Sequence, residues 1–373
     1  MVSPGLQPEF SRRRQTRLAS WMDQEQVDRM VVTRPEHVQY LTGFRPHRLM
    51  VAMFHLDRTG KGLLIAPNAA PDQAVADEIV TFPAQFHSTL RQDQHHAAAT
   101  VLADSTTVVD STRIGMEYSA IGESVRRAVA KGRSVEWVDV EPALWQARRR
   151  KDPDELALIE AAIACTGRMY ARAREIVRPG INELDVYGTL FREAVLAAGE
   201  PILDFGNDFQ AASPGGPPRD RVAERGELFV LDLGVSYRGY YADNCRTLVV
   251  GGTATAEQTG AWHAVVDVLR MIEEEVRPGV SCRAVFHRAQ AMLDTVRPGA
   301  FFHHLGHGIG LFPHEAPHLN PHWDDQFQAG ELFTAEPGVY WDSLRAGIRV
   351  EDDYLVTETG VRRLSQFPRE LIA

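Results

Sequence analysis

The sequence of 373 residues predicts an α/β domain over residues 1–148, followed over residues 152–373 by an α+β domain made of two related halves. Three observations lead to this prediction. Short β-branched runs alternate with helical patterns in the first part of the chain. A charged segment with a strong helix start follows at residues 146–152. The second part then repeats one order of elements, two helices and an acid-bearing hairpin.

The first domain is expected to alternate helices with strands. Hydrophobic periodicity and turn residues define these elements. Helices are expected over residues 9–24, 36–41, 72–78, 91–102 and 120–130, and strands over residues 28–33, 49–56, 63–67, 107–110 and 113–118. This alternation is typical of an α/β domain.

The second domain is expected to begin with a long helix. Asp152 can cap it, Pro153 suits its first position, and Glu155 suits its first turn. The helix should continue to about residue 177, where an Arg-Pro-Gly sequence follows.

An internal repeat organises the second domain. Residues 176–195 resemble residues 275–293, and an acid-bearing hairpin follows each of them. Thr255 and Gln258 form a capping box at the start of the helix that precedes the second copy. A pseudo-twofold axis would bring both hairpins to one central site. The alternative is that Val-Arg-Pro-Gly is only a common helix stop, since it recurs at residues 296–299 without a hairpin.

Each hairpin carries two acids inside its apolar runs. Asp232 and Asp243 are symmetric about the midpoint of residues 237 and 238, and Glu336 and Glu351 about that of residues 343 and 344. Pairing about these midpoints would place each acid opposite its partner, with Cβ atoms about 4.5–5.5 Å apart. Two carboxylates at that distance repel each other by about 3 kcal/mol at an effective dielectric constant near 20. Such pairs are protonated, solvated or bridged by a cation, and two pairs in one chain favour a cation.

A histidine-rich tract at residues 301–319 offers a further ligand. Its five histidines are His303, His304, His307, His314 and His318. Three glycines in the tract argue against a helix, and those around His307 suit a backbone that approaches a site closely. Four carboxylates and one imidazole exceed the needs of one tetrahedral zinc ion and suit two ions of higher coordination number. Two such ions lower the pKa of a shared water, which is hydrolase chemistry. A structural calcium site would not need the imidazole.

Four segments carry a resemblance to a known family. They read DLGVSYRGYYADNCRT, HHLGHGIGLFPHE, FTAEPGVY and GIRVEDDYLVTETG. They strongly resemble the signature blocks of the pita-bread metallopeptidases, and especially the Xaa-Pro peptidases, which are the prolidases and aminopeptidase P. The segment EHVQYLTGF resembles the creatinase-like N-terminal α/β domain that precedes that catalytic domain. The resemblance therefore covers nearly the whole chain.

The resemblance implies a role for each site residue. It places the ligands of two metal ions on Asp232, Asp243, His307, Glu336 and Glu351, with Asp243 and Glu351 bridging the ions. Glu336 would act as the general base and proton shuttle.

Further residues of the resemblance face the substrate. His303 would line the proline side of the pocket, His314 would stabilise the oxyanion, and Arg349 would contact the substrate. One departure concerns the loop before the first hairpin, where Gly215 stands in the place of a family histidine.

The function expected from the resemblance is that of a dinuclear metallo-exopeptidase that cleaves the Xaa-Pro bond of dipeptides, a prolidase. The alternatives are an aminopeptidase P acting on longer peptides, a small-molecule lyase or hydrolase on the same fold, and a non-enzymatic binding module. A prolidase needs a cation for the free carboxylate of its substrate. Arg45 and Arg48, which follow YLTGF, are candidates, although they can also be ordinary surface arginines.

Composition limits the binding partners and the cellular compartment that we expect for this protein. The net charge of −10 argues against nucleic acid and anionic membranes, and no apolar run reaches the length of a membrane helix. Three scattered cysteines and the lack of an apolar leader fit the cytoplasm. The carboxylate-rich ligand set favours Mn²⁺, with Co²⁺ or Zn²⁺ as alternatives. The resemblance also implies a homodimer.

Overall fold

The computed structural model describes residues 4–106 and 112–371. It contains two compact units, one of Gly5–Arg148 and one of residues 149–371 together with Pro4. The strand expected at residues 107–110 lies outside the described residues. Within the described part of the chain, no helix is both long and apolar enough to span a bilayer.

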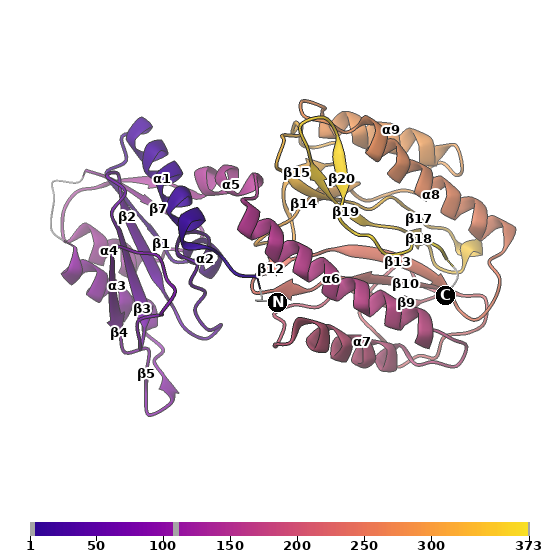
Figure 1. The fold of residues 1–373 in the computed structure, drawn as a ribbon, viewed down its shortest axis with the longest axis horizontal. Helices are drawn as coiled ribbons and strands as arrows, with labels where there is room; N and C mark the ends of the chain where they lie inside the picture. The colour runs from indigo at the N-terminus through magenta and orange to yellow at the C-terminus, as the bar shows by residue number, and fades with distance from the viewer. Residues whose placement is uncertain (1–3, 107–111, 372–373) are drawn as a thin grey trace. The chain divides into compact units, whose positions relative to one another are not determined.

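The N-terminal unit is built on a six-stranded mixed sheet with the order β4-β3-β2-β1-β7-β8 (Figure 1). Its strands are β1 (Arg29–Val32), β2 (Met53–Asp57), β3 (Gly62–Pro67), β4 (Glu78–Phe82), β7 (Arg113–Met116) and β8 (Glu136–Asp139), with a small ribbon of β5 (Gln85–Phe86) and β6 (Thr89–Leu90). Its helices are α1 (Pro8–Gln24), α2 (Pro35–Thr42), α3 (Gln94–Ser105), α4 (Glu123–Ala130) and α5 (Glu141–Arg149).

Both faces of this sheet are buried, as β1 shows. Val31 packs into a core cluster that includes Leu102 of α3 and Val125 of α4. Its neighbours Met30 and Val32 point to the opposite face and are also fully buried. A sheet covered on both faces is the arrangement expected of an α/β domain.

One expected helix of this unit is wrong. Residues 72–78 form no helix, and Glu78 instead begins strand β4, which pairs in parallel with β3. The β-branched residues Ile79, Val80 and Thr81 favour a strand, and pairing with β3 satisfies their backbone. The helix assignment was therefore overridden by a tertiary contact that a local pattern does not contain. The strand expected at residues 49–56 starts only at Met53.

The C-terminal unit consists of four long helices and two main sheets (Figure 1). The helices are α6 (Pro153–Ile176), α7 (Glu183–Ala198), α8 (Ala256–Glu275) and α9 (Cys282–Asp294). One sheet has the order β13-β10-β9 and contains β9 (Asp208–Ala211), β10 (Leu228–Leu233) and β13 (Asn244–Val249). The other has the order β15-β14-β16-β19-β20 and contains β14 (Gly306–Gly308), β15 (Glu315–Leu319), β16 (Leu332–Ala335), β19 (Asp352–Val356) and β20 (Val361–Arg363). Two ribbons extend the hairpins, β11 (Ser236–Tyr237) with β12 (Tyr240–Tyr241), and β17 (Gly338–Val339) with β18 (Ile348–Arg349).

Equivalent contacts in the two halves confirm the internal repeat. The glycine of each Arg-Pro-Gly turn has a left-handed backbone, with φ of 86° at Gly180 and 89° at Gly279. Each donates its N–H over 2.8 Å to a carbonyl that lies before the acid-bearing hairpin, that of Ala223 in the first half and that of Phe327 in the second. The repeat therefore extends from sequence to hydrogen bonding.

The register of the second hairpin is as the sequence predicts. Ala335 pairs with Asp352, and Gly338 pairs with Arg349, so Glu336 and Glu351 lie opposite each other between these pairs.

The register predicted for the first hairpin is wrong. Asp232 pairs with Cys245, two residues beyond Asp243, so the two aspartates are diagonal neighbours on one face. The turn is the cause. Arg238 and Gly239, with φ of 50° and 88°, form a two-residue turn, which moves the hairpin centre one position along the chain.

Candidate metal centre

The five candidate ligands lie in, or directly next to, five strands of the C-terminal unit. Asp232 lies in β10, Asp243 directly precedes β13, and Glu336 directly follows β16. Glu351 directly precedes β19, and His307 is the central residue of β14. The structure therefore brings together all five side chains that the sequence singles out.

Three overlapping groups, made of these side chains and two neighbouring histidines, could each hold a cation. Each group offers one ligand atom per residue, and within a group these atoms all lie within 4.8 Å of one another. The groups are Asp232, Asp243 and Glu351; Asp243, His307 and His314; and His304, His307 and Glu336. Because Asp243 and His307 each belong to two groups, the groups form one continuous site.

Unpartnered oxygens show that these residues fit a cation. Glu351 is 1% exposed, and neither of its carboxylate oxygens has a hydrogen-bond partner among the described residues. Oδ1 of Asp232 is also buried without a partner in the described part of the chain. Buried carboxylate oxygens without donors are costly unless a cation neutralises them. Oxygen-rich sites of this kind suit hard divalent ions.

Burial and mutual repulsion make these carboxylates hard to ionise. Burial, and then the charges of Asp232 and Glu336, raise the pKa of Asp243 well above its usual value. Burial, and then the charges of Asp243 and Glu336, do the same to the pKa of Glu351. Burial raises the pKa of Glu336 to about 8. A cation among these groups would favour their charged forms.

His307 is held with one ring nitrogen facing the acids. Its Nδ1–H donates to the carbonyl of Gly308 over 3.0 Å, which leaves Nε2 as the free acceptor. Nε2 lies 3.6 Å from Oε1 of Glu336 and 3.9 Å from Oδ2 of Asp243. Burial lowers the pKa of His307 well below its usual value, so the ring is neutral, the form that binds metals.

Three other histidines of the tract surround this centre. His314 stacks on His307 with ring centroids 3.8 Å apart and is exposed. Nδ1 of His304 lies 3.4 Å from Oε1 of Glu336, a contact that sequence reasoning did not assign to it. The fifth histidine, His318, is turned away and pairs with Asp325 over 2.8 Å.

His303 has both ring nitrogens engaged within the protein. Nδ1–H donates to the carbonyl of His304 over 2.8 Å, and Nε2 accepts from the hydroxyl of Tyr340 at 3.0 Å. Burial lowers the pKa of His303 to about 3, so the ring is neutral. The ring therefore presents a face, and no free proton, to the cavity that it lines.

Arg349 lies behind the first pair of acids. Its Nη2 donates to Oδ2 of Asp232 over 2.8 Å and also to Asp208, and its Nη1 donates to the hydroxyl of Tyr340 over 3.2 Å. Asp208 and Tyr340 were missed by sequence reasoning. Asp208 reaches the site through strand pairing with Asp232, and Tyr340 through hydrogen bonds to His303 and Arg349, so no local pattern reveals them.

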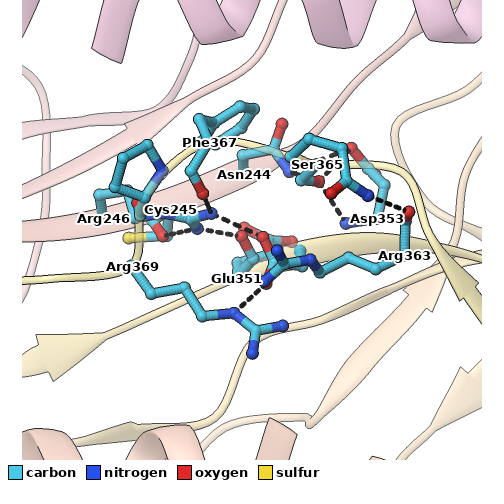
Figure 2. Close-up of polar contacts among 12 residues, drawn as sticks. Asn244, Cys245, Arg246, Glu351, Asp353, Arg363, Ser365, Phe367 and Arg369 are labelled. Atoms are coloured by element: carbon cyan, nitrogen blue, oxygen red, sulfur yellow. Dashed lines mark hydrogen bonds and ion pairs between the residues drawn. The ribbon is translucent and has the colours of Figure 1, made fainter. Parts of the chain in front are cut away.

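A buried polar network fixes the backbone behind the acids (Figure 2). Arg246 donates through Nη1 to the carbonyl of Glu351 over 2.5 Å and through Nη2 to Oδ1 of Asp352 over 2.6 Å. Asn244 donates over 3.0 Å to Asp353, which lies on the second hairpin. These contacts join the strand after Asp243 to the strand after Glu351, so both candidate ligands sit on one rigid frame.

A cavity of about 380 Å³ opens onto the centre. Fifteen residues line it, namely Asn207, Asp208, Pro214, Gly215, Asp232, Asp243, Phe302, His303, His304, His307, His314, Glu336, Tyr340, Arg349 and Glu351. Its size suits a small ligand.

Two further candidates from the sequence belong to the N-terminal unit. Arg45 donates to Glu36 over 3.1 Å and to Gln39 over 2.9 Å, and Arg48 is exposed. Their role toward a substrate stays a prediction.

The fold defines the class of protein, an α/β domain followed by a pita-bread catalytic domain with an internal repeat. Family comparison agrees with this. The model described as metallopeptidase family M24 matches residues 157–358, more than half of the chain, and the one described as creatinase/prolidase N-terminal domain matches residues 14–150. The chain therefore belongs to metallopeptidase family M24.

Individual relatives agree along the whole length. The Xaa-Pro dipeptidase of Pyrococcus furiosus is 25% identical over 364 residues, which cover 95% of this chain and 98% of that protein. The solved structure of an Xaa-Pro dipeptidase from Bacillus anthracis is 24% identical with a TM-score of 0.82, covering 97% of this chain and 99% of that one. The X-Pro aminopeptidase from Thermotoga maritima is 23% identical with a TM-score of 0.80, covering 96% of this chain and 99% of that one. The fold is thus shared by dipeptidases and aminopeptidases alike.

Proposed function

We propose that this protein is a metal-dependent exopeptidase that hydrolyses the Xaa-Pro bond, with dipeptides as its preferred substrates. One observation carries the proposal. Four buried carboxylates and a neutral imidazole converge beside a cavity, and buried oxygens of Asp232 and Glu351 have no protein partner among the described residues. Membership of metallopeptidase family M24 supports the same chemistry.

Asp232, Asp243, His307, Glu336 and Glu351 would hold two divalent ions. Bound there, the ions would supply Lewis acidity and a water molecule of lowered pKa. Mn²⁺ is the metal that we propose, because oxygen ligands outnumber nitrogen, although Co²⁺ or Zn²⁺ could take its place.

Glu336 is the proposed general base and proton carrier. Its carboxylate lines the cavity and lies within 3.6 Å of His307 and 3.4 Å of His304. Burial raises the pKa of Glu336 to about 8 without metal, and bound cations would lower it again, so the carboxylate would be ionised and able to accept a proton near neutral pH.

Two histidines are proposed to act on the substrate. His314 is exposed beside His307, so its ring can reach the oxyanion that develops at the scissile carbonyl. His303 presents its ring face to the cavity and is proposed to pack against the prolyl ring.

The proposed preference for dipeptides rests on the named relatives and on the arginines that could bind the free carboxylate of a dipeptide. The matching protein of Pyrococcus furiosus is named an Xaa-Pro dipeptidase. Arg349 already donates to Asp208 and Asp232, so its charge is not available for a substrate carboxylate. We therefore keep Arg45 and Arg48 as the candidates for that role. A homodimer is also part of the proposal.

A panel of Xaa-Pro dipeptides and Xaa-Pro-Yaa tripeptides, assayed with added Mn²⁺, Co²⁺ or Zn²⁺, tests this function. We expect metal-dependent release of the first residue, with dipeptides cleaved faster. A strong preference for tripeptides would indicate aminopeptidase P activity instead. Elemental analysis that finds no bound transition metal would favour a binding module.

A further inference from the structure

Asp208 lies directly opposite Asp232 across two paired strands. It is the first residue of β9, and its Cα partner in β10 is Asp232. Two carboxylates in that position repel each other unless something lies between them. Here the guanidinium of Arg349 lies between them and donates to both through the same nitrogen, Nη2.

The second oxygen of Asp208 fixes the loop on the other side. Oδ1 accepts from the backbone N–H of Gly216 over 2.6 Å. Both oxygens are therefore engaged, and the side chain is only 16% exposed although it lines the cavity. The carboxylate cannot turn aside without losing one of these contacts.

This pinned carboxylate explains the glycine at position 215. A Cβ added to Gly215 would lie 2.5 Å from Oδ2 and 2.7 Å from Cγ of Asp208, far inside van der Waals contact. Gly215 does not have a positive φ, so its backbone conformation does not require glycine. Space alone makes a side chain at residue 215 incompatible with Asp208.

The sharing of Arg349 affects the neighbouring candidate ligand. Arg349 contacts only Oδ2 of Asp232, and Oδ1 of Asp232 stays without a protein partner among the described residues. If Asp208 were absent, Asp232 would be the one carboxylate left to pair with this guanidinium among the described residues. Arg349 would then compete with a cation for Asp232.

We propose that Asp208 is a positioning residue of the metal centre, which holds Arg349 away from full pairing with Asp232 and thereby keeps Asp232 available to a divalent ion. This role rests on one part of the proposed function, the binding of a divalent ion, and does not depend on the peptidase activity. It also makes residues 208 and 215 a coupled pair, in which the aspartate requires the glycine.

Calorimetric titration of the metal-depleted full-length protein with Mn²⁺ tests the positioning role of Asp208. We expect Asp208→Ala to weaken Mn²⁺ binding about 10- to 100-fold, the range typical of groups that orient metal ligands. Asp208→Asn keeps the volume of the side chain but removes its charge. We therefore expect it to lose less Mn²⁺ affinity than Asp208→Ala. Glu200→Gln is the matched control, because Glu200 is another arginine-paired carboxylate, bound to Arg238, that does not line the cavity.

A double-mutant comparison tests the coupling. Gly215→Ala should weaken Mn²⁺ binding in the wild-type background, because its Cβ would displace the carboxylate of Asp208. In the Asp208→Ala background the same change should cost nothing further, since the obstructing atoms are gone.

Three results would overturn the proposal. They are wild-type Mn²⁺ affinity in Asp208→Ala, an equal loss in the Glu200→Gln control, and equal effects of Gly215→Ala in both backgrounds. If Asp208→Ala fails to fold, Asp208→Asn and Gly215→Ala decide the question. A wild-type protein that binds Mn²⁺ but cleaves no Xaa-Pro peptide would refute the proposed function and leave the role of Asp208 to the calorimetry.

Discussion

Glu336 and Glu351 face each other across the second hairpin, between the pair of Ala335 with Asp352 and the pair of Gly338 with Arg349. Both are buried, with exposed fractions of 7% and 1%. Their surroundings differ, because Oε1 of Glu336 lies near two histidine rings whereas Glu351 has no hydrogen-bond partner for either oxygen in the described part of the chain. The difference fits a catalytic role for Glu336 and a purely ligating role for Glu351.

Replacing Glu336 by glutamine should abolish turnover without unfolding the protein. The amide keeps the shape of the side chain but cannot accept and return a proton. Loss of a general base typically costs about 10²- to 10⁴-fold in rate. The measurements are kcat on an Xaa-Pro dipeptide and the thermal midpoint of the same preparation. An unimpaired Glu336→Gln enzyme would refute the assignment.

The metal-depleted protein should lose stability as the pH rises from about 6.5 to 8. Glu336 has a pKa of about 8 in the folded chain and about 4.3 when unfolded, so in this interval the folded state binds more protons. Stability from this group is present at low pH and falls as the pH approaches 8. Asp243 and Glu351, whose pKa values are also raised, act in the same direction.

The pH interval of this test begins at about 6.5 because the buried histidines affect stability at lower pH. Burial lowers the pKa of His303 to about 3 and of His304 to about 4, so these groups reduce stability only below their unfolded pKa near 6.5. Urea midpoints measured with a chelator at about pH 6.5, 7.2 and 8 therefore report mainly on the carboxylates. Saturating Mn²⁺ should remove the decline, and a chelated protein whose midpoint rises with pH would contradict the prediction.

The sequence predicts one hairpin better than the other for a physical reason. The acids mark the centre of the second hairpin correctly, because its two ribbons keep a single register through Glu336 and Glu351. In the first hairpin the turn sets the register, and Arg238 adopts a left-handed conformation that is uncommon for a side-chain-bearing residue. The local sequence pattern does not predict this conformation.

The candidate ligands were predictable, whereas the groups that orient them were not. An acid inside an apolar strand is visible in the sequence. Asp208 is not, because β9 was not recognised as a strand and the contact with Arg349 joins residues far apart in the chain. Arg246 and Asp352 behind the site are hidden for the same reason.

The turn of the first hairpin should be sensitive to a side chain at Gly239. Its φ of 88° lies in the left-handed region, where an L-residue costs about 1–2 kcal/mol. Gly239→Ala should therefore lower the free energy of unfolding by about that amount. Gly188→Ala is the matched control, since Gly188 lies inside α7 with open space around its Cβ, and it should raise stability by about 0.5–1 kcal/mol. Urea denaturation measures both, and equal effects would contradict the turn assignment.

Recognition of the substrate carboxylate separates the two arginines of the N-terminal unit. Arg45 already donates to Glu36 and Gln39, whereas Arg48 is exposed and has no acidic partner among residues 4–106 and 112–371. Arg48→Ala should therefore raise KM for an Xaa-Pro dipeptide more than Arg45→Ala does, with kcat little changed, because a charged hydrogen bond present in both ground and transition states is lost. The amide of the same dipeptide, which lacks the carboxylate, should bind the wild type and Arg48→Ala equally. A KM that rises as much for the amide as for the free acid would show that Arg48 does not bind the carboxylate. Unchanged KM values for both variants would show that Arg45 and Arg48 are ordinary surface arginines without a role in substrate binding.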